Sequence, residues 1–261
     1  MPDLRYHVIS LISVFLALAI GVLLGTAMAD RGVISDQLQN EVTNIQSQLD
    51  QQRELIAERD AKLSTMQQSV QGMSETMISD ELQGMNVALV YGPWADEEVA
   101  QSLQSTLSDA GANLTSFDQL PAPSPTEATG PDGTDTELLY TDLATEILDV
   151  PGSPNAPDGV VFLGGGEPPQ GATQGSVDIL AAAESAMFEV WLENGVRVVA
   201  TETADTPRSE VPLFQDVGVT SVDNVDQASG KAALVKLVDS LQDGSYGVKP
   251  TASDIFPPAS G

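Results

Sequence analysis

Two aspartates stand close together in the C-terminal part of the chain, in the order Asp223-Asn224-Val225-Asp226. Paired carboxylates can carry general acid–base chemistry when a fold brings them to one site. The same two residues can instead cap the helix that we predict over 227–242, where Asp226 would accept backbone N–H bonds from the first turn. We expect capping, because aspartate is a preferred residue at that position.

The groups that most often carry catalysis at neutral pH are missing from most of the chain. Cysteine is absent from all 261 residues, and the single histidine, His7, precedes a long apolar run near the N-terminus. This composition excludes disulfides, thiolate metal sites, Ser-His-Asp triads and zinc-hydrolase sites from the rest of the protein. An enzyme would have to use carboxylates or hydroxyls alone, so we predict no enzymatic activity, no catalytic residue and no resident cofactor.

A glycine-rich turn, Gly164-Gly165-Gly166 followed by Glu167 and two prolines, comes directly after a predicted buried strand. Open α/β sheets bind ligands at the carboxyl ends of their strands, so a pocket would form at this loop. The turn lacks the Gly-Lys-Ser/Thr of a phosphate loop and the spacing of a dinucleotide loop, and Glu167 would repel a phosphate. We expect glycines of a tight turn, with a ligand loop as the alternative.

Methionines are the only soft metal ligands in the chain, and Met66, Met73, Met77 and Met85 lie close together in sequence. Thioethers suit Cu(I), and Met73 and Met77 share a helix face, so a weak Cu(I) site is conceivable. However, three of the four fall on core positions of the heptad repeat described below, where flexible methionine packs well. We therefore expect core packing, and no metal-ligating residue is predicted.

The elements that would carry these groups begin with an uncharged run over residues 8–29. A helix of this length spans about 33 Å, enough to cross a bilayer, so we predict a transmembrane helix after a cytoplasmic stub, 1–7. The alternative is a signal peptide cleaved after Ala29, although the run exceeds the usual apolar region of such peptides. Arg5 and His7 favour an N-terminus in the cytoplasm and a C-terminal domain outside the cell membrane.

Small residues recur every four positions along this run and form a stripe on one helix face. Such a stripe lets two membrane helices approach closely, so we predict a dimer face there. Its residues are Ser13, Ala17, Gly21 and Gly25.

A heptad repeat follows the apolar run, and we predict a coiled-coil stalk over residues 30–84. All six a positions are apolar: Val42, Leu49, Ile56, Leu63, Val70 and Met77. Four of the six d positions are apolar as well: Leu38, Ile45, Gln52, Arg59, Met66 and Met73. The stripe and the heptads in series predict a parallel homodimer or a higher homo-oligomer.

Residues 85–250 show short apolar runs that alternate with helical patterns, which is typical of an α/β fold with a mainly parallel sheet. We predict a three-layer α/β/α sandwich of Rossmann or flavodoxin type. The expected strands are 87–91, 113–117, 160–163, 196–201 and 219–222. The expected helices are 97–110, 138–148, 176–194 and 227–242, three of them followed by a glycine suited to a helix end: Gly111, Gly195 and Gly244.

Two segments outside these elements have the composition of irregular chain. Residues 119–137 contain four prolines and no basic residue, which predicts a disordered insertion. Residues 251–261 are expected to form a flexible tail.

The charge balance is strongly acidic, with 38 acidic against 10 basic side chains and a formal net charge of −28. Residues 84–261 alone hold 27 acidic and five basic side chains. Such a surface repels nucleic acid, so we exclude DNA and RNA as partners.

Two stretches resemble the actinobacterial copper transporter family. Residues 4–25, LRYHVISLISVFLALAIGVLLG, are similar to its N-terminus, and residues 219–250 look like its C-terminal signature. The resemblance implies a cell-envelope protein of copper efflux or homeostasis, with copper as a transported ion. One membrane helix per chain cannot line an aqueous pore, so transport would need several copies or an envelope protein partner. The alternative function is a non-catalytic dimeric scaffold or sensor that presents its α/β module to a partner.

Overall fold

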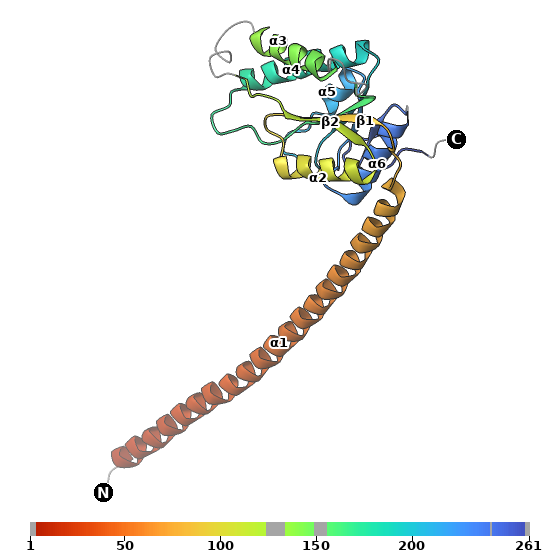
Figure 1. Ribbon diagram of the computed structural model, residues 1–261. Coiled ribbons are helices and arrows are strands. Elements are labelled where there is room, and N and C mark those ends of the chain that lie inside the picture. The colour runs from red at the N-terminus through yellow and green to blue at the C-terminus, as the bar shows by residue number, and fades with distance from the viewer. Residues whose placement is uncertain (1–3, 124–133, 149–155, 241, 259–261) are drawn as a thin grey trace. The chain divides into compact units, whose positions relative to one another are not determined.

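The computed structural model describes residues 4–123, 134–148, 156–240 and 242–258 (Figure 1). The chain divides into two compact units, residues 1–66 and residues 67–261. Each unit is described by itself below.

The first unit consists of the long helix α1, Leu4–Ile78, up to Met66. Its stretch Tyr6–Met28 has a mean hydropathy of 2.7 and is the one described helix long and apolar enough to cross a membrane. Ser13 donates its hydroxyl to the carbonyl of Ile9 at 2.9 Å, so this polar side chain is satisfied within the apolar stretch. A signal sequence near the N-terminus can meet the same criteria of length and composition.

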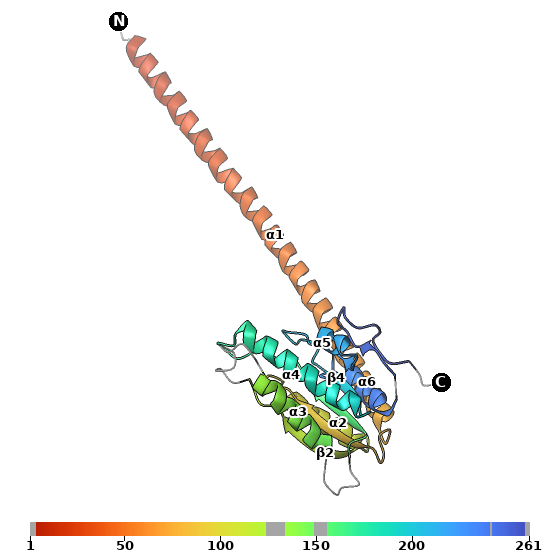
Figure 2. The same cartoon turned by 90° about the horizontal axis from the view of Figure 1, so that it is seen from above.

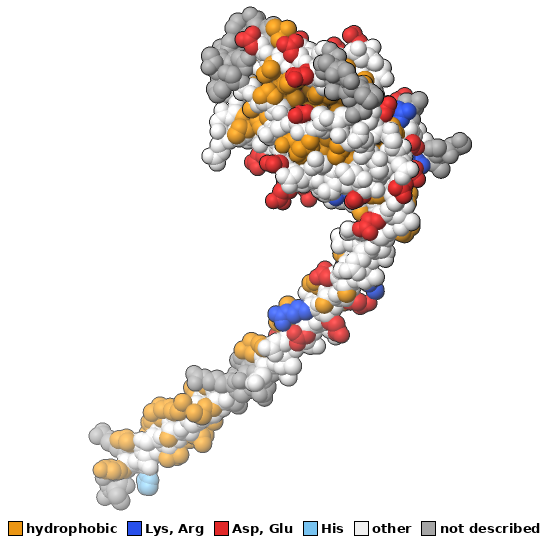
Figure 3. Space-filling model, in the orientation of Figure 1, with side chains coloured by type: hydrophobic (Ala, Val, Ile, Leu, Met, Phe, Trp, Pro, Cys, Tyr) orange, Lys and Arg blue, Asp and Glu red, His pale blue; other side chains and the backbone are white. Residues whose placement is uncertain are grey.

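The apolar residues of the heptad repeat lie exposed along α1, where they appear as orange patches between charged side chains (Figure 3). Each a-position side chain is at least 40% exposed: Val42, Leu49, Ile56, Leu63, Val70 and Met77. These side chains form an apolar seam along α1. Exposed apolar surface is unfavourable in water, and burial against a partner surface would recover that free energy. The dimer itself stays a prediction.

Helix α1 ends at Ile78, earlier than the predicted end near residue 84, and its last turns pack on the α/β domain. The Ser74 hydroxyl donates to the carbonyl of Ala228 at 2.8 Å, and Ile78 and Leu82 are buried in the core. A turn with positive φ at Asp80 (63°) then leads the chain into the sheet. The predicted limit between stalk and domain at residue 84 therefore cuts through one packed core.

The second unit is an α/β domain with one six-stranded sheet in the order β2-β1-β3-β4-β5-β6, every neighbouring pair being parallel. The strands are β1 Asn86–Tyr91, β2 Asn113–Gln119, β3 Gly159–Leu163, β4 Arg197–Thr201, β5 Thr220–Val222 and β6 Ser245–Tyr246. The predicted parallel α/β class is confirmed. Strand β6 is an addition to the five predicted strands.

Helices cover both faces of the sheet, which gives the three predicted layers (Figures 1 and 2). The helices that follow α1 are α2 Glu97–Asp109, α3 Thr134–Leu148, α4 Gln174–Glu193, α5 Val211–Asp216 and α6 Ala228–Asp239. Helices α2 and α6 cover one face, and α3, α4 and α5 cover the other. The short helix α5 has no counterpart in the sequence prediction.

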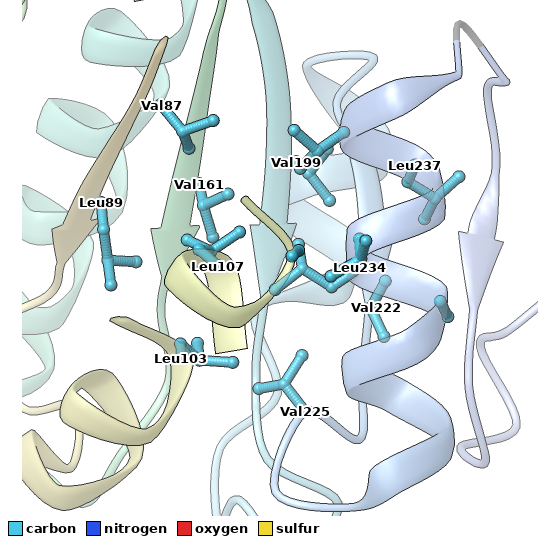
Figure 4. Packing of buried hydrophobic residues seen from close by; sticks show 14 of the residues in the cluster. Val87, Leu89, Leu103, Leu107, Val161, Val199, Val222, Val225, Leu234 and Leu237 are labelled. Carbon is cyan, nitrogen blue, oxygen red and sulfur yellow. The ribbon is translucent and has the colours of Figure 1, made fainter. Parts of the chain in front are cut away.

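The cores on the two faces follow from side-chain alternation along the buried strands. Val87 and Leu89 of β1 lie on the face covered by α2 and α6, in one buried cluster with Leu103, Leu107 and Leu234 (Figure 4). On the other face an aromatic group fills the space between sheet and helices. Its members are Tyr140, Phe162, Phe188, Trp191 and Phe214, with Phe162 and Phe188 packed edge to face at 5.1 Å between ring centroids.

The predicted disordered insertion, 119–137, is wrong at both of its ends. Strand β2 extends to Gln119, and α3 begins at Thr134 rather than at residue 138. Between them, Leu120 is buried and the Tyr140 hydroxyl donates to the carbonyl of Pro121 at 2.8 Å. Residues 124–133 lie outside the described residues.

Two of the three predicted helix-stop glycines adopt the left-handed conformation, Gly111 with φ 86° and Gly195 with φ 72°, directly after the ends of α2 and α4. Helix α6 ends at Asp239, three positions before the predicted end at 242, so Gly244 does not terminate it.

The segment after Pro250 is fastened to the edge of the sheet as far as it is described, contrary to the predicted flexible tail, 251–261. The backbone N–H of Ser253 donates to the carbonyl of Ser245 at 2.7 Å. The N–H of Gly247 donates to the carbonyl of Asp254 at 2.9 Å. Residues 252–254 thereby cover the outer side of β6, which would otherwise be an open edge. Residues 259–261 lie outside the described residues.

Candidate functional site

The strand order places the sheet's switch point between β1 and β3, since β2 follows β1 on one side and the later strands lie on the other. Ligands of doubly wound sheets bind at this point, outside the carboxyl ends of the strands. The glycine turn after β3 is therefore at the position where a ligand would be expected.

The glycine turn is filled by the protein's own groups. Its three N–H donors bind the carbonyl of Thr201 (Gly164, 2.8 Å), the Oε2 of Glu210 (Gly165, 2.6 Å) and the hydroxyl of Thr206 (Gly166, 3.2 Å). Positive φ angles of 77° and 108° at the second and third glycines aim these donors, and glycine adopts such angles most readily. Residues 164–169 form no regular turn, contrary to the expected tight turn, and the N–H donors of the three glycines bind other segments of the domain.

The Glu210 carboxylate accepts from the glycine turn at the place where the anionic group of a ligand would otherwise bind. It lies at the N-cap position of α5 and is 7% exposed. Its backbone N–H donates to the Oε2 of Glu202 at 2.8 Å. Burial raises the pKa of Glu210, although the Gly165 N–H and the charge of Arg208 act in the opposite direction.

Glu184 is a second buried carboxyl group at the same place, contributed by the middle of α4. It is 1% exposed, and its Oε2 has no hydrogen-bond partner. Burial raises its pKa well above the ordinary value, the charge of Glu210 raises it further, and Arg208 partly offsets both effects. Burial also raises the pKa of the Tyr140 phenol, with the charges of Glu184 and Glu210 adding to the shift.

Glu202, directly after β4, is the third buried carboxylate and the best satisfied. It accepts from the Ser209 hydroxyl at 2.6 Å and from the Glu210 N–H at 2.8 Å, and it forms an ion pair with Lys249. Hydrogen bonds and a cation of this kind are what a fully buried charge needs. Glu202 thus links Lys249, which follows β6, to the carboxyl end of β4. Through its bond to Glu210, it is also linked to Gly165.

The two aspartates singled out in the sequence serve as loop anchors. Asp223 is 1% exposed and accepts from the N–H groups of Val248 at 2.6 Å and Lys249 at 3.1 Å. Asp226 accepts from the N–H of Ala204 at 2.7 Å. The predicted capping role of Asp226 is wrong, because Gln227 is the N-cap residue of α6 and makes no side-chain cap bond.

A glycine makes the first of these anchors possible. A Cβ on Gly247 would overlap the Asp223 carboxylate, so only glycine fits beside it. The same holds at Gly230 of α6, where a Cβ would overlap the backbone carbonyl of Asn224. The Asp223-Asn224-Val225-Asp226 stretch and the glycines after it therefore form one closely packed structural unit.

A larger open space lies elsewhere in the domain. A cavity of about 370 Å³ lies between β2 and α3, with apolar contacts from Leu120, Leu143 and Ile147 and with Asp118 and Glu146 among its other lining residues. Among the residues that the structure describes, no three His, Asp or Glu side chains are grouped so as to hold a metal ion. The three buried glutamates at the carboxyl ends of the strands, Glu184, Glu202 and Glu210, can therefore bind and position loops, and their carboxyl groups can hold a proton.

The other predicted site residues lie on α1. Ser13, Ala17, Gly21 and Gly25 belong to the candidate membrane span, and Leu49 and the other a positions follow on the same helix. Sequence reasoning missed Glu184, Glu202 and Glu210.

The architecture defines a class of protein: an N-terminal apolar helix with the length of a membrane span, followed on the same chain by a doubly wound α/β domain. Residues 1–122 match the family model described as "Copper transport outer membrane protein, MctB". The resemblance to the copper transporter family is thus confirmed over this part of the chain.

Curated relatives agree with the family model. The copper transporter MctB of Mycobacterium tuberculosis is 31% identical over 118 residues, which are 44% of this chain and 36% of the relative. The protein of the same name from Mycobacterium bovis gives the same values. The aligned part therefore spans about a third of the length of these relatives.

Among solved structures, a mutant of the receiver domain of the histidine kinase CKI1 from Arabidopsis thaliana covers 63% of this chain and 91% of its own length. Its TM-score is 0.34 and its sequence identity 15%.

Proposed function

We propose that this chain is a membrane-anchored protein of the cell envelope that acts in copper efflux or homeostasis. The observation that carries the proposal is the match of residues 1–122 to the copper transport family, since it includes both the apolar helix and the first two strands of the α/β domain. The relatives named copper transporters, 31% identical over 118 residues, support the same conclusion.

The proposed topology has one membrane span, with the N-terminus in the cytoplasm and the α/β domain outside. The span Tyr6–Met28 supports the anchor, and the basic flank at Arg5 favours this orientation. A single span offers no aqueous path for an ion, so the chain would act as a homodimer, as a higher oligomer or with an envelope partner. The exposed heptad seam and the small residues Gly21 and Gly25 supply surfaces for a second copy.

A copper-tolerance experiment tests the proposed function. Deletion of the gene should make the host strain more sensitive to copper and raise its cellular copper content. The full chain should restore tolerance, whereas a chain that begins at Asp30 should fail because it lacks the anchor. N-terminal sequencing of the membrane-bound full chain provides the control for cleavage. Unchanged copper tolerance and copper content in the deletion strain would contradict the proposal.

We further propose that the chain acts in copper transport or homeostasis without binding copper with high affinity. Cysteine is absent, and the methionines Met66, Met73 and Met77 lie on seam positions that a second copy would cover. Purified full-length protein should therefore lose Cu(I) to a competing chelator without stoichiometric retention. Tight binding that disappears in the double variant Met73→Leu/Met77→Leu would show instead that the thioethers form a copper site.

A non-catalytic scaffold or sensor is the second candidate function. It is favoured because the protein's own side chains occupy the ligand position at the carboxyl ends of the strands. The turn at Gly165 binds the protein's own Glu210, and Asp223 and Asp226 hold loops rather than face a cavity. A domain of this kind would act through its surface. Cross-linking in intact membranes should then capture a defined envelope partner, and a deletion strain should show normal copper tolerance.

A further inference from the structure

The segment that joins β4 to α5, residues 202–210, lies across the carboxyl ends of the strands and is referred to here as the strap. Its Glu210 accepts from the Gly165 N–H and its Thr206 from the Gly166 N–H. Its Ala204 donates to Asp226. The strap thus occupies the donors that the switch point of an α/β sheet offers to a ligand.

Five other titratable or charged groups face or adjoin the Glu210 carboxylate. Helix α4 contributes Glu184 and helix α3 contributes Tyr140. The strap itself contributes Glu202 and Arg208, and Lys249 of the C-terminal segment neutralises Glu202.

The carboxyl group of Glu184 has no such counter-charge within hydrogen-bond distance, and its Oε2 has no partner at all. Two carboxylates in one buried site cannot both ionise without strong repulsion, so such pairs retain one proton. The Glu210 carboxylate accepts a short 2.6 Å bond from the Gly165 N–H, which favours its ionised form, whereas the Glu184 Oε2 accepts no bond, so the arrangement favours the proton on Glu184.

We propose that Glu184 and Glu210 form a proton-operated latch that holds the strap over the carboxyl edge of the sheet. With the proton on Glu184, the Glu210 carboxylate stays bonded to Gly165 and the strap is closed. When the proton passes to solvent, the two buried carboxylates repel each other, and the strap lifts and uncovers the N–H donors of the glycine turn.

The strap moves because Glu184 cannot. Glu184 lies in the middle of α4, between the buried residues Ala183 and Met187. Glu210 is the last residue of the strap, in which Asp205 and Pro207 are already exposed. Lifting the strap brings the Glu210 charge into water at the cost of a few hydrogen bonds, whereas moving Glu184 would disrupt a helix.

The direction of the pH dependence follows from the same groups. Burial raises the pKa of Glu184 in the folded protein, so the closed state binds a proton that the opened state releases. The latch is therefore fully closed at acidic pH, below the ordinary pKa of a glutamate, and opens as pH rises through the raised pKa of Glu184.

Hydrogen exchange of the Gly165 and Gly166 amides in the full-length, detergent-solubilised chain tests the latch. After correction for intrinsic exchange rates, their protection should be constant at acidic pH. Between the ordinary pKa of a glutamate and the raised pKa of Glu184 it should fall by about tenfold per pH unit, because opening releases one proton in that range, and above the raised pKa it should level off. In Glu184→Gln the protection should stay flat with pH. The matched control Glu189→Gln, an exposed position on the same helix, should behave as the unmodified chain does.

Pronounced pH dependence in the unmodified chain that persists in Glu184→Gln would overturn the proposal, and so would protection that is flat in the unmodified chain between pH 5 and pH 9. If Glu184→Gln does not fold, Glu210→Gln replaces it. Its amide oxygen can still accept from Gly165, but the charge pair is gone. A weakened pH dependence in Glu210→Gln supports the latch, because burial of Glu184 persists without the charge of Glu210, and an unchanged pH dependence refutes it.

Discussion

Replacing Gly166 by alanine is expected to be the most destabilising single substitution in the glycine turn, lowering the free energy of unfolding by about 3 kcal/mol or more. Two penalties add. A Cβ at this position would overlap the backbone carbonyl of Trp94, which has no side-chain freedom to move aside. The φ of 108° also lies in a region that alanine rarely adopts. Urea denaturation of the purified chain, followed by tryptophan fluorescence, measures the loss.

A matched control separates the two penalties. Gly171 has a similar φ of 98°, but a Cβ there would meet no atom within 4 Å. Gly171→Ala should therefore cost only the conformational term, about 1–2 kcal/mol. Equal losses for the two variants would show that the close approach between the loops after β1 and β3 is not required.

The parts of the fold that could be predicted from the sequence are those with regular patterns long enough to recognise. The apolar runs 87–91 and 160–163 are buried strands of the sheet, and the helical pattern at 176–194 is α4. Strand β6 has two residues and helix α5 has six, too few for any periodicity to appear. Such elements form because neighbours hold them, so their own residues carry little signal.

The interpretation of Asp226 failed for a related reason. Capping is a local rule, but the N–H that Asp226 binds belongs to Ala204, a residue on another loop. The tail was misjudged in the same way, since Ser253 is fixed by the carbonyl of Ser245 and not by any pattern of its own. Contacts between loops depend on the assembled sheet and are invisible to reasoning along the chain.

One residue of the latch did leave a signal. Glu184 lies four positions after Leu180 and four before Phe188, on the apolar stripe of α4. An acidic residue on a buried stripe is unusual and points to a special environment. Glu202 and Glu210 gave no such signal, because their burial depends on how the strap folds over the edge of the sheet.

Replacing both Leu49 and Ile56 by aspartate is expected to convert the fragment 30–261 from a dimer to a monomer. The two side chains occupy consecutive a positions of the heptad and are 46% and 58% exposed on the isolated helix. In a parallel pair each substitution would place two like charges in one core layer and remove the apolar contact that holds it. Analytical ultracentrifugation of the unmodified fragment and of its Leu49→Asp/Ile56→Asp variant measures the mass of each in solution.

The matched control adds the same two charges outside the seam, as Gln51→Asp and Ala57→Asp at heptad positions c and b. This fragment should stay dimeric, which separates the loss of the seam from the effect of added charge on an already acidic chain. Near-UV circular dichroism should be the same in all three fragments, because Leu49 and Ile56 lie outside the α/β domain. A Leu49→Asp/Ile56→Asp fragment that remains dimeric would place the contact between copies in the α/β domain, and the exposed seam of α1 would then need another partner.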